Sequence, residues 1–431
     1  MNKLFIFFFT LGLSISGFAQ NGKKLFKPID FLKIKNLKEA TISPDEKWVA
    51  YSLSEVDTAT DKRVSHLYMQ SLTSADSVQL THGSNPASSP KWSPDNKFLA
   101  FLSSRDSKTG SQVWVLNRSG GEAKKLTDIK GDLNSFEWSP DSKKLVLLIQ
   151  DPENKEKKEP KSPLPIIIDR YHFKQDIDGY LQNGHTHLYL FEIAVKKLDT
   201  LTHGNTDDAE PAWSPDGKKI AFVSNHTTDP DRNSNTDIFT VDAVKGGKIL
   251  QLTTWKGHDN HPRWSPDGKK ISLLRSTSDA DYLMYDQDIL AIMDADGSNT
   301  TLLTTLLDRP VSDQVFTKDG KNLGFLIADD RKVILATYNF KTRKIIRQTN
   351  GENAIVNIEA LGLDNWVITM TTRYLPAELY AFEKGKTRKL TQHQNWLKEY
   401  KLAHVAGFQS SSKDGTAVSG ILYTPDSIRS K

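Results

Sequence analysis

The chain has 431 residues, enough for two or three average domains or for one large ring of repeats. It contains no cysteine, which excludes disulfide bridges, cysteine nucleophiles and thiolate metal sites. Charged residues make up 26% of the chain with a net charge of +4, and the two signs are interspersed, which argues against a nucleic-acid-binding stripe.

Residues 1–19 have the pattern of a secretory signal peptide. Lys3 supplies positive charge, an apolar run extends from Leu4 to Ile15, and a small-x-small cleavage site precedes Gln20. The run is too short to span a membrane, and no cysteine follows the cut to carry a lipid anchor. We therefore expect a mature protein that starts near Gln20, without a membrane span, in the periplasm or outside the cell. The alternative is an uncleaved anchor helix.

A turn motif recurs after the lead-in segment 20–36. Its fullest form is Trp-Ser-Pro-Asp-Gly-Lys, in which Pro presets φ, Asp hydrogen-bonds its own backbone and Gly takes a positive φ. The residue before the turn closes one strand, and an alternating apolar run opens the next. The Ser or Thr of each copy stands at Ser43, Ser93, Ser139, Ser214, Ser265 and Thr317.

A second marker has the same period. A short strand followed by a Leu-Thr step, or by Gln-Thr in one unit, places threonines at Thr81, Thr127, Thr202, Thr253, Thr304, Thr349 and Thr391. A period of about 40–50 residues is typical of propeller blades with four strands each. The predicted fold is therefore all-β: a seven-bladed β-propeller over 37–392, with four antiparallel strands per blade and no strand shared to close the ring.

The third unit carries an insertion over 151–185. It begins as a mixed-charge loop and continues into a segment that concentrates ionic and aromatic groups. Binding residues lie disproportionately on such elaborated loops, and the alternative is a surface hairpin that merely covers blade edges. The candidate binding residues are Arg170, Tyr171, Asp176, Asp178 and Tyr180.

The segment 393–431 differs from the repeats, because it holds two strand candidates around a turn and two strands cannot form a domain. Together with the propeller it resembles the prolyl oligopeptidase family of serine peptidases, nearest the acylaminoacyl-peptidase and dipeptidyl-peptidase branches. The resemblance implies that the propeller caps an α/β-hydrolase domain, limits access to short peptides, and is followed by the first strands of that domain. The residues that carry it are Phe408, Asp414, Gly415, Gly420, Leu422, Tyr423 and Pro425.

The catalytic motif of that family is missing from this sequence. An α/β-hydrolase needs G-x-S-x-G followed by Asp and His, and the nearest match, at residues 12–16, lies in the signal peptide and lacks the final Gly. We therefore expect no catalytic residue, no cofactor and no activity in this chain alone, which would be the N-terminal piece of a longer peptidase. In that enzyme, an Arg or carboxylate of the insertion would pair with a terminus of a peptide substrate.

Other polar clusters favour structural interpretations. His185 and His187 share a strand face, and His258 lies near His261 in a loop, but zinc needs a third or fourth ligand. The segment 294–299 resembles the start of a calcium loop without its glutamate, so a hairpin turn is expected there. No metal site is predicted.

Two other functions stay open. A propeller of the TolB kind would dock protein partners, although TolB-like proteins place their extra domain before the propeller. A sugar or lactone enzyme would need a metal in the channel, with ligands from several blades that the repeats do not show at matched positions. The favoured interpretation is the substrate-gating propeller of a secreted serine peptidase.

Overall fold

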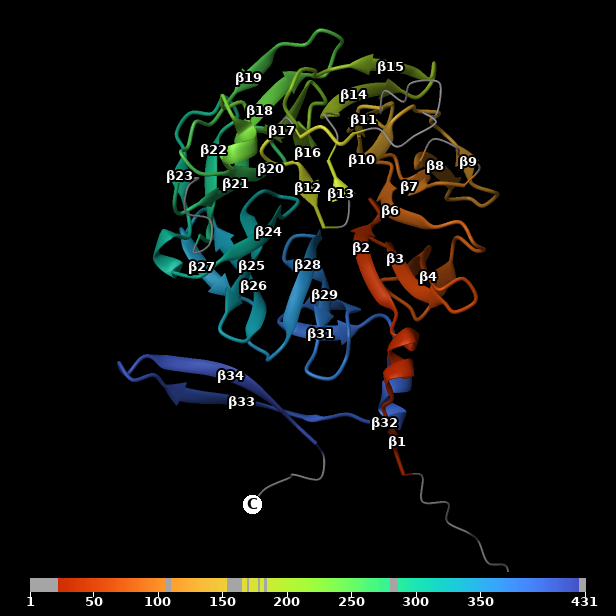
Figure 1. Cartoon of the computed structure of the whole chain (residues 1–431), viewed down its shortest axis with the longest axis vertical. Coiled ribbons are helices and arrows are strands. Elements are labelled where there is room, and N and C mark those ends of the chain that lie inside the picture. The colour runs from red at the N-terminus through yellow and green to blue at the C-terminus, as the bar shows by residue number, and fades with distance from the viewer. Residues whose placement is uncertain are drawn as a thin grey trace, which may run out of the picture.

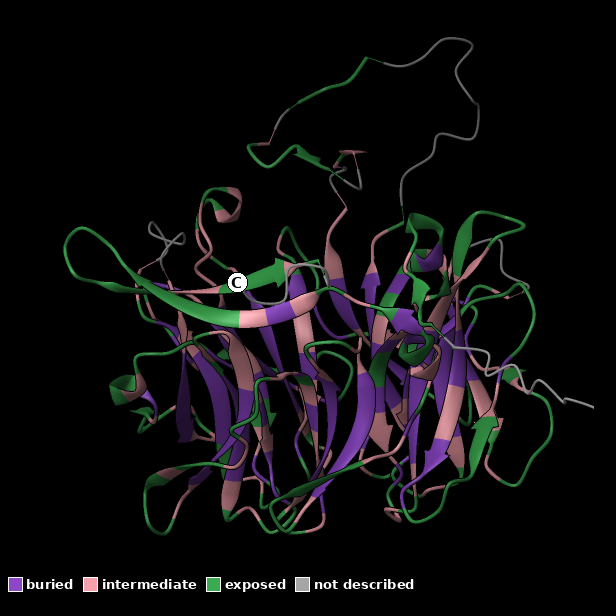
Figure 2. Ribbon diagram, turned by 90° about the horizontal axis from the view of Figure 1, so that it is seen from below, coloured by how far each residue is buried: buried purple, intermediate pink, exposed green. Residues whose placement is uncertain are grey.

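The computed structural model describes residues 22–105, 110–152, 165–168, 170–176, 179–181, 184–279 and 286–425. Its sheets stand side by side around a central axis, as Figure 1 shows. Buried residues are concentrated within the sheets, whereas the loops at both ends of the ring are mostly exposed (Figure 2). The predicted all-β propeller architecture is confirmed, and the predicted signal peptide lies outside the described residues.

Five four-stranded antiparallel sheets follow one another along the chain, and each pairs its strands in chain order. They are β2 (Asn36–Ile42), β3 (Trp48–Asp57), β4 (Lys62–Ser71) and β5 (Ser77–Gln79); β6 (Ala87–Trp92), β7 (Phe98–Ser103), β8 (Gln112–Asn117) and β9 (Lys124–Lys125); β10 (Asp132–Trp138), β11 (Lys144–Gln150), β14 (Thr186–Glu192) and β15 (Lys197–Thr200); β16 (Asp208–Trp213), β17 (Lys219–Ser224), β18 (Asp237–Asp242) and β19 (Ile249–Gln251); β20 (Asp259–Trp264), β21 (Lys270–Ser276), β22 (Asp288–Asp294) and β23 (Thr301–Leu302).

The next sheet has eight strands, in two runs of four that a single parallel pair, Val333 with Ala354, joins. The first run is β24 (Val311–Phe316), β25 (Asn322–Asp329), β26 (Lys332–Asn339) and β27 (Lys344–Arg347). The second is β28 (Ala354–Leu361), β29 (Asn365–Thr371), β30 (Glu378–Glu383) and β31 (Lys386–Lys389).

Three two-stranded pairs lie outside these sheets: β1 (Lys24–Leu25) with β32 (Tyr400–Lys401), β12 (Lys174–Gln175) with β13 (Gly179–Tyr180), and β33 (His404–Ser411) with β34 (Ala417–Thr424). The helices are short 3-10 turns: η1 (Pro28–Lys33), η2 (Pro230–Arg232), η4 (Thr305–Leu307) and η5 (Asn395–Glu399). Across the described ranges, none is long and apolar enough to cross a membrane.

Six of the turns between first and second strands are built around a Ser or Thr hydroxyl, and the turn between β28 and β29 lacks one. In the turn at Ser214, the Oγ donates to Asp216 Oδ1 at 2.7 Å and accepts from the N–H of Lys219 at 2.9 Å. Gly217 takes φ +69°, and its Cα faces Pro140 of the preceding turn. The same hydroxyl pattern occurs at Ser43, Ser93, Ser139, Ser265 and Thr317.

Neighbouring sheets are tied together by the residue before the turn. Trp138 Nε1 donates to the carbonyl of Lys91 in the preceding sheet at 3.1 Å. Trp92, Trp213 and Trp264 make the equivalent bond. Because each of these indole N–H groups is satisfied by the preceding sheet, the aromatic ring can be placed between sheets without leaving a buried donor unpaired.

The Leu-Thr step closes the outer edge of each unit. The threonine Oγ1 accepts a hydrogen bond from a backbone N–H of the third strand, at 2.8–3.0 Å. This satisfies a donor where the short fourth strand ends. The threonines are Thr81, Thr127, Thr202, Thr253, Thr304, Thr349 and Thr391.

The first and last sheets meet without a shared strand in the part of the chain that the structure describes. Apolar side chains of both sheets form one buried cluster that includes Leu37, Val49, Leu361 and Val367. Glu46, in the first turn, accepts a hydrogen bond from the N–H of Gly362 at 2.9 Å and forms an ion pair with Lys318. Side-chain packing and this polar contact therefore close the ring.

Candidate functional site

The insertion is anchored on the loop between β17 and β18. Arg170 Nε and Nη2 donate to the two carboxylate oxygens of Asp231 at 2.9 and 2.5 Å. The guanidinium of Arg232 lies over the ring of Tyr171, 4.6 Å from its centroid. The Arg170 guanidinium holds the pKa of Asp231 below its usual value, so this carboxylate is ionised at neutral pH.

The other predicted residues of the insertion are more peripheral. Tyr180, on β13, stacks on Phe173 with 6.4 Å between ring centroids. Asp176 is exposed and makes no hydrogen bond or ion pair with another described residue, and Asp178 lies outside the described residues. The structure therefore brings Arg170 and Tyr171 together, and the binding role of all five residues stays a prediction.

Arg170 and Tyr171 line a cleft of about 530 Å³ beneath the insertion. Its charged groups are paired with one another, because Arg232 also contacts Asp229 at 3.0 Å. A ligand with a charged group would have to compete with these internal ion pairs. The remaining lining residues are His185, Asn205, Pro230 and Asp231.

A histidine fixes the base of the insertion. His187 is buried, with its ring nitrogens 3.7 Å from Asp151 and 3.6 Å from Asp208. The Asp208 carboxylate beside the ring raises the pKa of His187, and the nearby Asp151 and Asp207 act in the same direction. This histidine therefore ties the first residue of the insertion to the fourth sheet.

The second histidine cluster is also a set of ion pairs. His258 Nε2 lies 2.8 Å from Asp288, which raises the pKa of the imidazole, and His261 lies beside Glu210. Within the described ranges there is no group of three or more His, Cys, Asp or Glu residues that could hold a metal ion. Each of these histidines therefore contacts a carboxylate.

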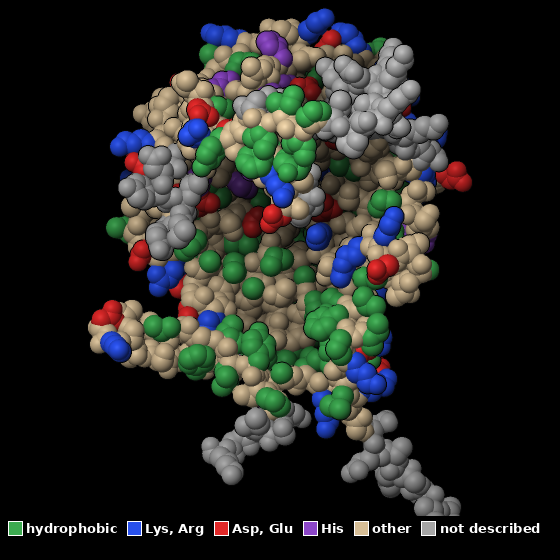
Figure 3. Space-filling view, viewed as in Figure 1, with side chains coloured by type: hydrophobic (Ala, Val, Ile, Leu, Met, Phe, Trp, Pro, Cys, Tyr) green, Lys and Arg blue, Asp and Glu red, His purple; other side chains and the backbone are tan. Residues whose placement is uncertain are grey.

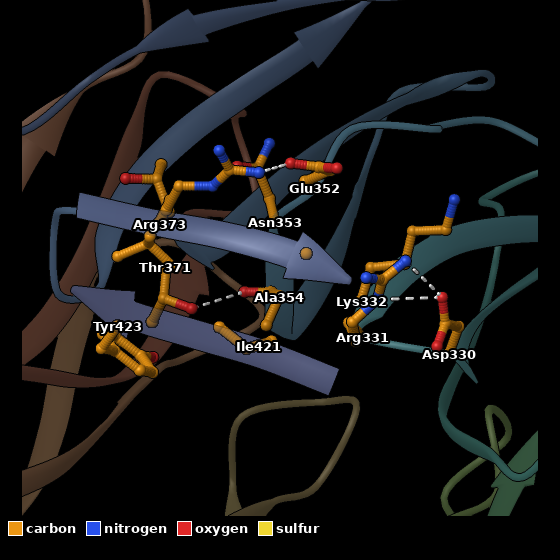
Figure 4. A pocket seen from close by; sticks show the side chains of 13 residues that line it. Asp330, Arg331, Lys332, Glu352, Asn353, Ala354, Thr371, Arg373, Ile421 and Tyr423 are labelled. Carbon is orange, nitrogen blue, oxygen red and sulfur yellow. Dashed lines mark hydrogen bonds and ion pairs between the residues drawn. The ribbon is translucent and has the colours of Figure 1, made fainter. Parts of the chain in front are cut away.

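The C-terminal hairpin β33–β34 rests on the ends of the last two runs of strands. Arg331 Nη1 donates to the carbonyls of Phe408 and Gly420 at 3.3 and 3.2 Å. A cleft of about 350 Å³ separates the hairpin from these loops, and Arg373 forms an ion pair with Glu352 across its floor (Figure 4). The hairpin side of the cleft is lined by Val405, Gly407, Ile421 and Tyr423.

The hairpin lies on the insertion side of the ring. Figure 2 shows the insertion rising from one face and the hairpin at the rim of the same face. Two of the loops beneath the hairpin, at Arg331 and Arg373, follow the second strand of their run, as the insertion follows β11. Large apolar side chains are exposed along the hairpin (Figure 3), among them Phe408, Val418, Ile421, Leu422 and Tyr423.

Sequence reasoning missed Asp231, Arg232 and Arg331. The signal for the first two was a charged Asp-Pro-Asp-Arg run in a loop at the same strand connection as the insertion. Arg331 stands in a similar charged run, Asp329-Asp330-Arg331-Lys332, but such a run in a tight turn is usually solvated surface.

Comparison with known proteins shows peptidases that match most of the chain and TolB propellers that match a part of it. The TolB beta propeller domain model matches residues 179–290. The chain is 26% identical to the uncharacterised peptidase YuxL of Bacillus subtilis, over 94% of this chain and 64% of the relative. It is 25% identical to dipeptidyl-peptidase 5 of Porphyromonas gingivalis, over 75% of this chain and 49% of that protein.

A solved structure agrees in fold. The acylaminoacyl peptidase of Pyrococcus horikoshii superposes with a TM-score of 0.76 and 20% identity, covering 93% of this chain and 60% of that one. The predicted resemblance to prolyl oligopeptidase-family peptidases is confirmed by these relatives. The chain spans about half to two thirds of the length of these relatives.

Proposed function

We propose that this chain is the substrate-gating propeller of a secreted serine peptidase that acts on short peptides. The observation that carries the proposal is the similarity to a peptidase along 94% of the chain. The hairpin supports it, because a two-stranded sheet with exposed apolar side chains on the insertion face is suited to continue into a further domain. The propeller would then cover the active site and restrict access to it.

Serine labelling tests the enzymatic part. The protein encoded by the full-length gene should hydrolyse short peptides, should not degrade an unfolded protein of the same local sequence, and should react stoichiometrically with a fluorophosphonate. The 431-residue chain should neither hydrolyse short peptides nor react with the fluorophosphonate, because it has no G-x-S-x-G motif to present an activated serine. Labelling of a serine in this chain would contradict the proposal, as would a full-length protein that remains unlabelled.

A docking propeller of the TolB kind is the second candidate, favoured by the family model that matches residues 179–290. It accounts for a smaller part of the chain than the peptidase similarity. The full-length form of such a protein would bind a protein partner and would lack peptidase activity. The labelling experiment therefore distinguishes a docking propeller from a peptidase.

We place the protein in the periplasm or outside the cell on the strength of its N-terminal pattern. Mass spectrometry of native protein should find a mature N-terminus at Gln20 or within a few residues of it. Retention of Met1 in a cytosolic fraction would contradict this placement.

We also propose that the ring has seven blades, counting the eight-stranded sheet as two. The single residue pair that joins its two runs supports this count, as do the Thr349 and Thr391 contacts, one in each run.

A further inference from the structure

The central channel contains a polar cavity far from the insertion. It has a volume of about 600 Å³ and lies at the end of the channel formed by the Ser-Pro-Asp turns. Four innermost strands, β6, β10, β20 and β28, contribute one charged residue each: Lys91, Glu137, Arg263 and Glu359. Three tryptophans of the turn motif, Trp92, Trp138 and Trp213, form part of its wall.

The charges in this cavity are unevenly paired. Lys91 and Glu137 form an ion pair with each other. Glu39, at the side of the cavity, accepts hydrogen bonds from the N–H of Ser89 at 2.7 Å and from the hydroxyl of Ser52 at 2.8 Å. These three charged groups are therefore already satisfied by the fold.

Arg263 is different. Its side chain donates to the carbonyl of Pro262 at 3.1 Å, and no carboxylate among the described residues lies within ion-pair distance of it. The residue is exposed to the lumen of the channel. Most of the donors of its guanidinium fork are thus directed to solvent in the cavity, where an anion would find them preorganised.

Glu359 does not neutralise this arginine effectively. No hydrogen bond or ion pair with a described residue reaches its carboxylate, and burial raises its pKa to about 7. Arg263 and Lys91 act to lower that pKa and Glu137 to raise it, while the neighbouring inner strands bring Glu39 and Asp313. Near neutral pH a large fraction of Glu359 is protonated and can donate a hydrogen bond to an anion.

We propose that this cavity binds a carboxylate, with the Arg263 guanidinium as its primary contact and Glu359 beside it. The size of the cavity fits a few amino-acid residues, and the tryptophan wall fits their apolar parts. That the natural ligand is a short peptide held by its C-terminal carboxylate rests on the proposed function; recognition of the carboxylate rests on the cavity alone.

Calorimetry with the mature chain, residues 20–431, tests this without any need for peptidase activity. Tri-alanine with a free carboxylate should bind, the N-acetylated form should bind equally well, and the C-terminal amide should bind at least roughly tenfold more weakly, because a charged hydrogen bond is lost. Equal affinities for the acid and the amide would overturn the proposal. So would no binding of the free acid at millimolar concentration, or loss of binding on acetylation instead of amidation.

Variants locate the site. Arg263→Gln should weaken binding of the free acid at least roughly tenfold, whereas Arg63→Gln, at an exposed arginine of β4, should leave it unchanged. At pH 8, where Glu359 is mostly ionised, Glu359→Gln should bind more tightly than the wild-type chain because the repulsion is removed. Unchanged affinity in a folded Arg263→Gln chain, with its melting temperature measured alongside, would overturn the assignment whether or not the parent protein is a peptidase.

Discussion

At the scale of single residues, the insertion depends on one ion pair. Arg170 is one of the five candidate binding residues, and in the structure its Nε and Nη2 both donate to Asp231. A planar guanidinium that meets a carboxylate with two parallel bonds gives orientation as well as attraction. This geometry favours an anchoring role for Arg170 over a direct contact with substrate.

The pair of variants Arg170→Ala and Asp231→Ala distinguishes these roles. If Arg170 is an anchor, both variants should open the insertion to limited proteolysis and should lower kcat/KM of the full-length enzyme equally for free and blocked peptides. Arg170→Lys should not restore protection, because a lysine cannot reproduce the fork. If Arg170 binds substrate, only its own replacement should selectively impair peptides with free termini.

The same pair should respond to acid. The pKa of Asp231 is lowered in the folded protein, so its contribution to docking is complete above the usual pKa of an aspartate and is lost as the pH falls through the folded value. The difference in proteolysis between the wild-type chain and Arg170→Ala should therefore vanish in strong acid. A difference that persists there would mean that the pair does not hold the insertion.

At the scale of elements, most of the fold could be predicted from the turn repeat. The Ser, Asp and Gly of each copy have roles that follow from local chemistry, so their positions predicted strand boundaries well. The β-bulges of the inner strands were not predictable, because residues such as Glu39, Glu210 and His261 adopt positive φ for reasons set by the neighbouring sheet. Tertiary contacts, here a carboxylate that accepts the next strand's N–H, override local preference.

The candidate site could likewise be predicted only in part. The insertion was visible as an interruption of the period, and its concentration of ionic and aromatic residues was visible in the sequence. Its partners were not, since Asp231 is 61 positions from Arg170 and belongs to another sheet. The channel cavity was invisible for the same reason, because Arg263 and Glu359 come from strands that only the closed ring brings together.

At the scale of the whole molecule, closure of the ring is the distinctive feature. Glu46 adopts φ +58° in a turn position where three other copies have glycine, which is an unfavourable conformation for a glutamate. It is retained beside Gly362 and Lys318, the two groups that it contacts across the junction of the first and last sheets. We infer that it acts as the polar clasp of the ring.

Glu46→Gln and Lys318→Ala should each lower the free energy of unfolding by about 1 kcal/mol, a modest value because both side chains are partly exposed. Lys318 holds the pKa of Glu46 below its usual value, so this contribution should be lost as the pH falls through the folded pKa. Lys269→Ala, in the turn of the fifth sheet, is the matched control. Equal melting temperatures for all three variants and the wild-type chain would show that the contact does not close the ring.

The pairing of β1 with β32 has a mechanical consequence. Lys24 pairs with Tyr400 in parallel register, and the rings of Phe26, Trp396 and Tyr400 pack on one another beside them. A force applied to the hairpin reaches this strand pair and its packed rings first, and they transfer the force to the N-terminal segment that leads into β2. Less of the force therefore acts on the junction between the first and last sheets. A domain attached through the hairpin could move without opening the ring.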